Sequence, residues 1–222
     1  LLYFILVISF NYAQFDWDGN GIPVRQGYHI EWYRGGDISS DGNMLVVWSD
    51  TRTSTRDVYA QSVDANGNIR WDTDGVLIAG GESRQEDPII ISDNSGGGFI
   101  SWRSYINDPI YGELYVQRID SDGGVLWATE KLISGNIKVR SQSQQNMCSD
   151  RQGGVYVTWY EDAFAGDGNY YGTHLQADGT FVGPDLLIET DENYGSVSLE
   201  SAGGGDAVLA WKEGNNGSEN IY

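Results

Sequence analysis

The sequence predicts an all-β fold, a partial β-propeller of four-stranded antiparallel blades, from a repeated string, a companion string and the composition. A run ending in tryptophan occurs four times, as SSDGNMLVVW at 39–48, SDNSGGGFISW at 92–102, SDRQGGVYVTW at 149–159 and SAGGGDAVLAW at 201–211. The final tryptophans of these runs are 54, 57 and 52 residues apart. Repeats of this length are typical of propellers, in which each repeat forms one blade. Thirty glycines, eight tryptophans and fourteen tyrosines suit short aromatic strands joined by tight turns rather than long helices.

A second repeated string lies between these runs. It reads DVYAQSVDANGNIRW at 57–71, ELYVQRIDSDGGVLW at 113–127 and, in a weaker copy, YYGTHLQADGTFVG at 170–183. Each repeat therefore divides into four strands: an apolar run such as 88–92, the Trp-ending run, the Tyr-containing run, and the segment after the Asp-Gly or Asn-Gly turn. We expect each repeat to form a four-stranded antiparallel meander.

The Trp-ending runs are apolar almost throughout, as in Met44 to Trp48 and Val155 to Trp159. This is typical of strands buried on both faces of a sheet. One blade buries too little surface to be stable alone, so the sheets must stack, and radial stacking gives a propeller. A linear stack of sheets is the alternative. In either arrangement we expect the four repeated tryptophans to be core residues, namely Trp48, Trp102, Trp159 and Trp211.

The chain is expected to contain a signal peptide remnant at 1–14 followed by an incomplete propeller at 15–222. The apolar run LLYFILVISF is too short to span a bilayer and suits a secretory signal, so we predict a secreted or cell-surface protein with no membrane span. FDWDGNGIPV at 15–24 resembles IRWDTDGVLI at 69–78 and predicts an N-terminal closing strand. The predicted segments are a closing strand at 15–26, blades at about 27–81, 82–136 and 137–191, and half a blade at 192–222.

Charge and cysteine content exclude some classes of protein. The net charge of −19 is opposite to that of a protein that binds phosphate backbones, so nucleic acid is excluded as a partner. The single cysteine, Cys148, excludes an internal disulfide, and its alignment with Ile91 predicts a buried thiol. His174 aligns with Arg118 and Ser62, and this variation predicts a surface position. The sequence contains no Ser-His-Asp pattern, histidine metal cluster, P-loop or dinucleotide motif.

Three arginines and two aromatic residues are the candidate ligand-binding residues. Arg25, Arg84 and Arg140 recur at the starts of successive repeats and could form a ring of guanidinium groups that binds carboxylates or sulfated glycans. The alternative is a structural role, for instance pairing with Glu86 or Asp87. Trp32 and Tyr33 lie outside the repeating positions and are candidates for an exposed aromatic contact.

Residues 16–21 are the candidate metal site. Asp16, Asp18 and Asn20 place oxygen ligands at alternate positions before a glycine, as in the first half of a calcium loop. The twelfth position is Gly27 rather than a bidentate glutamate, and the equivalent segment of the next repeat is typical of a turn. The prediction is no cofactor, with calcium at this loop as the alternative.

Several strings resemble a propeller-like repeat of large secreted bacterial surface proteins of the type IX secretion type. They are WSDTR at 48–52, DVYAQ at 57–61, DANGNIRW at 64–71 and RQEDPI at 84–89. The resemblance covers roughly residues 15–222 and implies the repeat architecture without specifying a reaction.

Two families that contain enzymes resemble the repeat more weakly. LYVQRIDSDGGVLW at 114–127 is similar to the repeat of quinoprotein propellers, but only the structural Tyr, Gly and Trp match, and no cofactor or calcium ligand can be carried over. The strings at 92–102 and 149–159 are similar to the Asp-box of sialidases, with an extra residue between Asp and Gly. In that family the box is structural and lies away from the active site.

The sequence favours a non-catalytic binding or display scaffold whose partner is a glycan or a protein at the propeller mouth or loops. The alternative is a carbohydrate-active hydrolase, a sialidase-like propeller that uses carboxylates of the channel. The two hypotheses differ in one feature. An enzyme should have acidic residues that break the repeat register and converge on the axis, whereas a scaffold should keep its blades equivalent.

Overall fold

A computed structural model describes residues 4–5, 22–25, 31–107, 112–134, 145–161, 169–188, 194–215 and 218–221, with backbone only at 4–5, 31–34, 194–196, 212–215 and 218–221. All regular structure in this part of the chain is β-strand. It forms three four-stranded antiparallel sheets, one three-stranded sheet and one two-stranded pair. The predicted partial propeller of four-stranded blades is confirmed. No helix in the described residues is long and apolar enough to cross a membrane.

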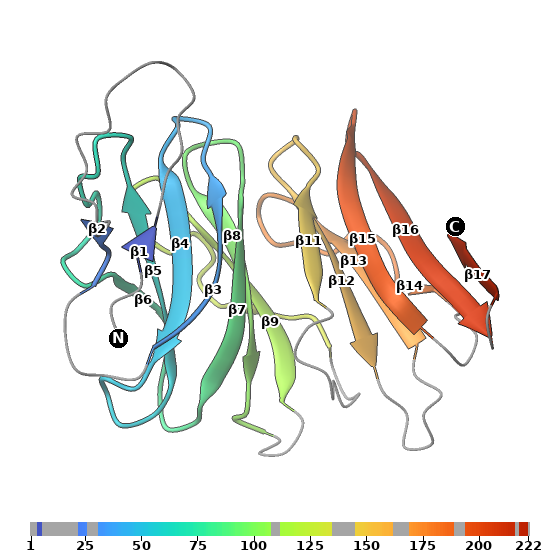
Figure 1. The fold of residues 1–222 in the computed structure, drawn as a ribbon, viewed down its shortest axis with the longest axis horizontal. Coiled ribbons are helices and arrows are strands. Elements are labelled where there is room, and N and C mark those ends of the chain that lie inside the picture. Colours follow the sequence, from blue (N-terminus) through green and yellow to red (C-terminus); the bar gives the residue numbers. More distant parts are fainter. Residues whose placement is uncertain are drawn as a thin grey trace.

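Each sheet is one blade, and its strands pair in chain order (Figure 1). The first blade contains β3 (Glu31–Ile38), β4 (Met44–Asp50), β5 (Asp57–Val63) and β6 (Val76–Ala79). The second contains β7 (Gln85–Ser92), β8 (Gly98–Ser104), β9 (Glu113–Ile119) and β10 (Lys131–Leu132). The third contains β11 (Asn146–Ser149), β12 (Val155–Glu161), β13 (Asn169–Leu175) and β14 (Leu186–Ile188). The fourth contains β15 (Tyr194–Gly203), β16 (Asp206–Asn215) and β17 (Ser218–Ile221).

The blades stack face to face in chain order, and their first strands form the inner side of the stack. Strand β7 contacts β3 on one side and β11 on the other, and β11 contacts β15. The remaining pair, β1 (Phe4–Ile5) with β2 (Ile22–Pro23), lies beside the first blade (Figure 1). Within the predicted closing strand 15–26, residues 22–25 are described, and Val24 packs against Val46 and Trp48 of the first blade.

A cross-strand aromatic pair occupies the same place in three blades. Strand register puts Trp48 opposite Tyr59, Trp102 opposite Tyr115 and Trp159 opposite Tyr171. The rings are stacked, with centroids 6.2, 6.1 and 5.8 Å apart. The three tryptophans are at most 3% exposed, so the prediction that they are core residues is confirmed. Trp211 is half-buried and packs against the cluster between the third and fourth blades.

The two faces of each blade meet different neighbours because side chains alternate along a strand. Leu45 and Val47 of the first blade pack with Ile100 and Trp102 of the second. Phe99 of the second blade, on the opposite face, belongs to the cluster formed with the third blade, whose members include Val155, Val157 and Trp159. The repeated tryptophan therefore always faces the preceding blade, and each strand is buried on both sides as its composition predicts.

A second tryptophan ties each blade to the next one. The indole of Trp71 donates a hydrogen bond from Nε1 to the carbonyl of Ser121, at 2.8 Å, in the turn after β9 of the second blade. Trp127 makes the same bond, at 2.9 Å, to Ala177 in the third blade. Each indole lies on the glycine of that turn, where an added Cβ would lie 2.9 Å from Trp71 or 3.0 Å from Trp127. These glycines, Gly123 and Gly179, are therefore required both for their positive φ and for this contact.

A buried glutamine holds each of these tryptophans by its backbone. Gln61 accepts a hydrogen bond from the amide of Trp71 at 3.0 Å and donates one to the carbonyl of Asp72 at 2.8 Å. Gln117 binds both the amide and the carbonyl of Trp127, at 3.2 and 3.1 Å. We call this arrangement the Gln–Trp clamp.

The fourth strand differs from the sequence prediction. Directly after the turn the chain makes only single bridges, Val63 to Ile69 and Ile119 to Val125, and the fourth strands begin later, at β6 and β10. The third blade makes the same single bridge, Leu175 to Phe181, and its fourth strand also begins late although it has no tryptophan at this position, so the break in the ladder does not depend on the Gln–Trp clamp.

The clamp predicts a large stability effect at one residue. Replacing Trp127 with alanine removes an indole that is 4% exposed, with its inter-blade hydrogen bond, and should lower the free energy of unfolding by about 3–5 kcal/mol. Leu126→Ala is the matched control. The Leu126 side chain, next to Trp127 in the chain, is 48% exposed, and its loss should cost less than about 1 kcal/mol. Urea denaturation of both variants measures the difference, and equal midpoints would contradict the role given to the clamp.

Candidate functional site

Buried carboxylates gather at one end of the blades. We define the loop end as the end at which second strands such as β4 and β12 finish and first strands such as β7 begin, the lower edge in Figure 1. Five acidic side chains here are at most 6% exposed: Asp50, Asp57, Glu86, Asp87 and Glu161. Burying that much charge is unfavourable unless each group has a partner, so the partner of each one decides its chemistry.

In the first blade the buried carboxylate of Asp50 is paired with arginine side chains. Asp50 accepts hydrogen bonds from the indole of Trp48 at 3.0 Å and from the guanidinium of Arg52 at 2.5 Å. Arg25 lies 3.7 Å from the same carboxylate. Burial would raise the pKa of Asp50, but the hydrogen bonds from Arg52 and Trp48 outweigh it and hold the pKa below its ordinary value.

The predicted ligand-binding residues lie partly within the described structure. Arg25, against Asp50, has a side chain that is 7% exposed. Arg84 lies over the ring of Tyr105, 3.9 Å from its centroid, and 4.0 Å from the Glu86 carboxylate. Trp32 and Tyr33 pair in β3 with Ser49 and Trp48, but their side chains lie outside the description. Arg140 and the calcium-loop residues Asp16, Asp18 and Asn20 also lie outside the described residues.

The first strand of the second blade contains a β-bulge, as do the first strands of the first and fourth blades. The pairing of β7 with β8 shifts between Glu86 and Ile89, and Asp87 adopts a φ of +53°, a conformation unusual for a residue other than glycine. The carboxylate of Asp87 binds Arg103 through Nη2 at 2.5 Å and Nε at 3.1 Å. The carboxylate of Glu86 pairs with Arg56 of the first blade. Backbone strain of this kind is often found at functional sites.

The third blade carries a carboxyl group of a different kind. Glu161 is 4% exposed and accepts one hydrogen bond, from Nε1 of Trp159 at 2.7 Å. Its second oxygen, Oε2, is buried without a hydrogen-bond partner. Burial, with a smaller contribution from the charge of Asp185, raises the pKa of Glu161 above its ordinary value. Glu161 occupies the position of Asp50 in its repeat, so equivalent positions have opposite pKa shifts.

Glu161 and the Asp87–Arg103 pair border the same space between two blades. Arg103 follows Phe99 by four residues on β8, so it faces the third blade as Phe99 does. Glu161 follows Trp159 by two residues on β12, so it faces the second blade. Gln145, which directly precedes β11 of the third blade, donates a hydrogen bond to the carbonyl of Asp87. The loop end between these blades therefore holds one ion-paired carboxylate and one carboxyl group with a raised pKa.

A polar cleft lies at the loop end between the first and second blades. Its volume is about 340 Å³, and its polar lining comes from Gln85, Ser104, Asn107, Tyr115 and Glu130. Tyr115 donates a hydrogen bond to Glu113 at 2.9 Å, and burial together with Glu113 and Glu130 raises the pKa of this phenol to about 12. The repeat analysis missed this cleft, because Asn107 and Glu130 come from irregular segments without repeat partners.

At the opposite end of the blades His174 is half-buried, less exposed than predicted. Its side chain is 20% exposed, stacks on Tyr156 with centroids 4.1 Å apart, and lies 2.9 Å from the carboxylate of Asp150. The equivalent Arg118 pairs with Asp93 at 2.7 Å, so in these two blades the variable position binds the aspartate of the turn. Cys148 is buried, as predicted, and burial raises its pKa to about 11.

The described residues contain no group of three or more His, Cys, Asp or Glu side chains that could hold a metal ion. The predicted calcium loop lies outside them.

Comparisons with known proteins found similar folds but no family. No family model and no curated protein matches the chain. One similar solved structure is an endo-arabinase from Bacteroides thetaiotaomicron VPI-5482, with 14% identity over 95% of this chain and 77% of that chain and a TM-score of 0.48. Another is an α-L-arabinofuranosidase from Lactobacillus brevis, with 10% identity over 78% of this chain and 62% of that chain and a TM-score of 0.43.

The prediction of a non-catalytic scaffold is corrected by this comparison. Both similar structures are of enzymes that are named for carbohydrate substrates. The substrates in those names belong to those two proteins. In this chain the opposite pKa shifts of Asp50 and Glu161 make the blades unequal at the loop end.

The raised pKa of Glu161 predicts the pH dependence of stability. Because its folded-state pKa lies above the unfolded value near 4.5, the folded chain binds more protons than the unfolded chain above that pH, and stability falls as the pH rises through this window. Glu161→Gln should therefore raise the Tm by about 2–4 °C at pH 7 and leave it unchanged near pH 3.5. Thermal melts at the two pH values test this, with the exposed Glu200→Gln as the control. A lower Tm for Glu161→Gln at pH 7 would show that the charged form is stabilised instead.

Proposed function

We propose that this chain belongs to a carbohydrate-active hydrolase that uses carboxyl groups at the loop end between the second and third blades. The observation that carries the proposal is the contrast between Glu161, whose pKa burial raises, and Asp87, which is ion-paired with Arg103 in the same inter-blade space. Two carboxyl groups in different environments are what glycoside hydrolysis needs, because one donates a proton and the other acts as a charged base or nucleophile.

Glu161 suits the role of general acid. A raised pKa keeps a larger fraction of the group protonated near neutral pH, and its partnerless Oε2 is the atom that would carry the proton to a leaving-group oxygen. The bond from Trp159 to the other oxygen fixes the orientation of the carboxyl group.

Asp87 suits the role of the charged partner. Its two bonds to Arg103 hold the carboxylate in place, and the strained backbone presents it at the start of the innermost strand of its blade.

The polar cleft between the first and second blades, on the other face of the second blade from these carboxyl groups, is proposed as an additional binding region for the glycan. Amide and carboxyl groups of Gln85, Asn107 and Glu130 provide hydrogen-bond donors and acceptors for sugar hydroxyls, and Tyr115 adds an aromatic wall. The arginines at this end are paired with carboxylates, so they do not favour an acidic sugar over a neutral one. We further propose that the chain is part of a surface protein of the type IX secretion type and acts outside the cell. The apolar run at 1–10 and the repeat resemblance support this proposal.

Hydrolysis of a glycan panel tests the proposal. We expect the full chain to release reducing sugar from at least one neutral polysaccharide in a panel that includes arabinan, xylan and sialylated oligosaccharides, with and without calcium. Glu161→Gln and Asp87→Asn should each lower kcat by at least about 100-fold, because each removes a group that acts in the transition state.

Glu200→Gln is the matched control, since Glu200 is an exposed carboxylate on β15. It should retain full activity. Binding of a glycan without turnover, or full activity in both loop-end variants, would overturn the proposed reaction. A Glu161→Gln variant that gains thermal stability at pH 7 but loses activity would separate a catalytic role from a structural one.

A further inference from the structure

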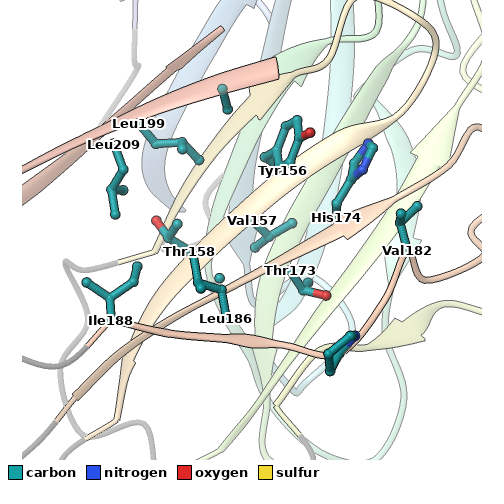
Figure 2. A pocket seen from close by; sticks show the side chains of 13 residues that line it. Tyr156, Val157, Thr158, Thr173, His174, Val182, Leu186, Ile188, Leu199 and Leu209 are labelled. Carbon is teal, nitrogen blue, oxygen red and sulfur yellow. The ribbon is translucent and has the colours of Figure 1, made fainter. Parts of the chain in front are cut away.

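A cavity of about 260 Å³ lies between the third and fourth blades, away from the loop-end carboxyl groups. Figure 2 shows Leu199 and Leu209 of the fourth blade on one side and Leu186 and Ile188 of the third blade on the other, with Thr158 between them. The lining is mostly apolar. The same space between the first and second blades, and between the second and third, is filled by the indoles of Trp71 and Trp127.

The third blade has lost the whole Gln–Trp clamp. The amide of Val182 donates a hydrogen bond to the carbonyl of His174, just as the amide of Leu126 donates one to the carbonyl of Arg118. Val182 is therefore equivalent to Leu126, and Gly183 stands where the second blade has Trp127. Strand register likewise places Thr173 where the second blade has Gln117, and Gly172 where it has Val116. Three larger residues that touch one another in the second blade are thus replaced together by smaller ones. Gly172 and Thr173 line the cavity, and Val182 and Pro184 line it on either side of Gly183.

The loss of the clamp leaves a polar group without a partner. Thr173 is 6% exposed, and its hydroxyl makes no hydrogen bond in the structure, whereas Gln61 and Gln117 at this position are fully bonded. Thr158 is also buried without a partner. The side chain of Thr173 faces the second blade rather than the cavity, because it lies opposite Val157 and alternates along β13 with Tyr171 and Leu175, which pack in the cluster between the second and third blades. The cavity is therefore bounded mainly by apolar side chains.

An aromatic pair forms another wall of the cavity. The rings of Tyr156 and His174 stack with an interplanar angle of 13°, and both residues line the space. The hydroxyl of Tyr156 is fixed by a hydrogen bond to the carbonyl of Gly205 at 2.8 Å, which joins the third and fourth blades beside the cavity.

We propose that this cavity binds a planar aromatic molecule of indole size. The ligand occupies the space that an indole of the chain fills at the two preceding interfaces. An apolar cavity of about 150 Å³ suffices to bind benzene, so the larger cavity accommodates a two-ring molecule. The proposal does not depend on the proposed hydrolase activity.

Indole itself is the probe for this site. Added to the full chain at ten times its Kd, indole should raise the Tm by about 3–6 °C, because it binds the folded state alone. Isothermal titration should give one site per chain.

Two variants fill the cavity from opposite sides. Gly172→Val restores the residue of the second blade, and the added Cβ would lie 3.4 Å from Thr158, an ordinary contact. Leu209→Phe fills the space from the fourth blade. Each should abolish the indole-dependent shift in Tm. Ser198→Val is the matched control, since Ser198 lies on β15 with an exposed side chain and does not line the cavity.

Two results would overturn the proposal. One is a folded chain whose Tm and titration heats do not respond to indole at its solubility limit. The other is an unchanged indole affinity in folded Gly172→Val and Leu209→Phe variants, which would place the ligand elsewhere.

Discussion

The contact on which the rest of the fold depends is the indole of one blade lying on the glycine turn of the next. Trp71 and Trp127 each bury an aromatic ring and donate a hydrogen bond to a backbone carbonyl 50 residues further along the chain. A single blade has no way to cover its faces, so these inter-blade contacts join the first three marginal sheets into one stack. The turn must have glycine at the contact, and a buried glutamine holds the tryptophan backbone in place.

The repeated contacts leave the loop end free to vary. Blade stacking relies on residues along the strands and at the turn end, whereas the residue two positions after the repeated tryptophan contributes little to it. That residue is Asp50, Ser104 and Glu161 in the first three blades. Hydrogen bonds from the adjacent Arg52 and from Trp48 outweigh burial and lower the pKa of Asp50, whereas burial is the largest effect at Glu161 and raises its pKa. One scaffold position thus gives two acids with opposite pKa shifts, and the surrounding cations decide which of them suits proton transfer.

The sequence predicts what repeats and fails where function depends on contacts between distant residues. The Trp–Tyr pairs, the meander and the burial of Cys148 follow from alignment of the repeats, because identical residues at equivalent positions have identical surroundings. The partners of charged residues do not follow from it. Asp87 pairs with Arg103 on the neighbouring strand of its blade, and His174 is half-buried because Asp150 of the turn binds it. The scaffold interpretation failed for the same reason, since it assumed that the blades are equivalent.

The departures from the repeat are concentrated in the third blade, and this has a physical consequence. The same sheet carries the buried acid Glu161 on one face and the replaced clamp and the cavity at Gly172 on the other. The loss of the clamp removes favourable packing, so we expect the interface of this blade with the fourth to be less stable than the two before it. The free energy of local opening therefore varies along the stack and is lowest next to the cavity. A small ring can enter there without disturbing the clamps that hold the first three blades, and the loop-end acids remain positioned while it does so.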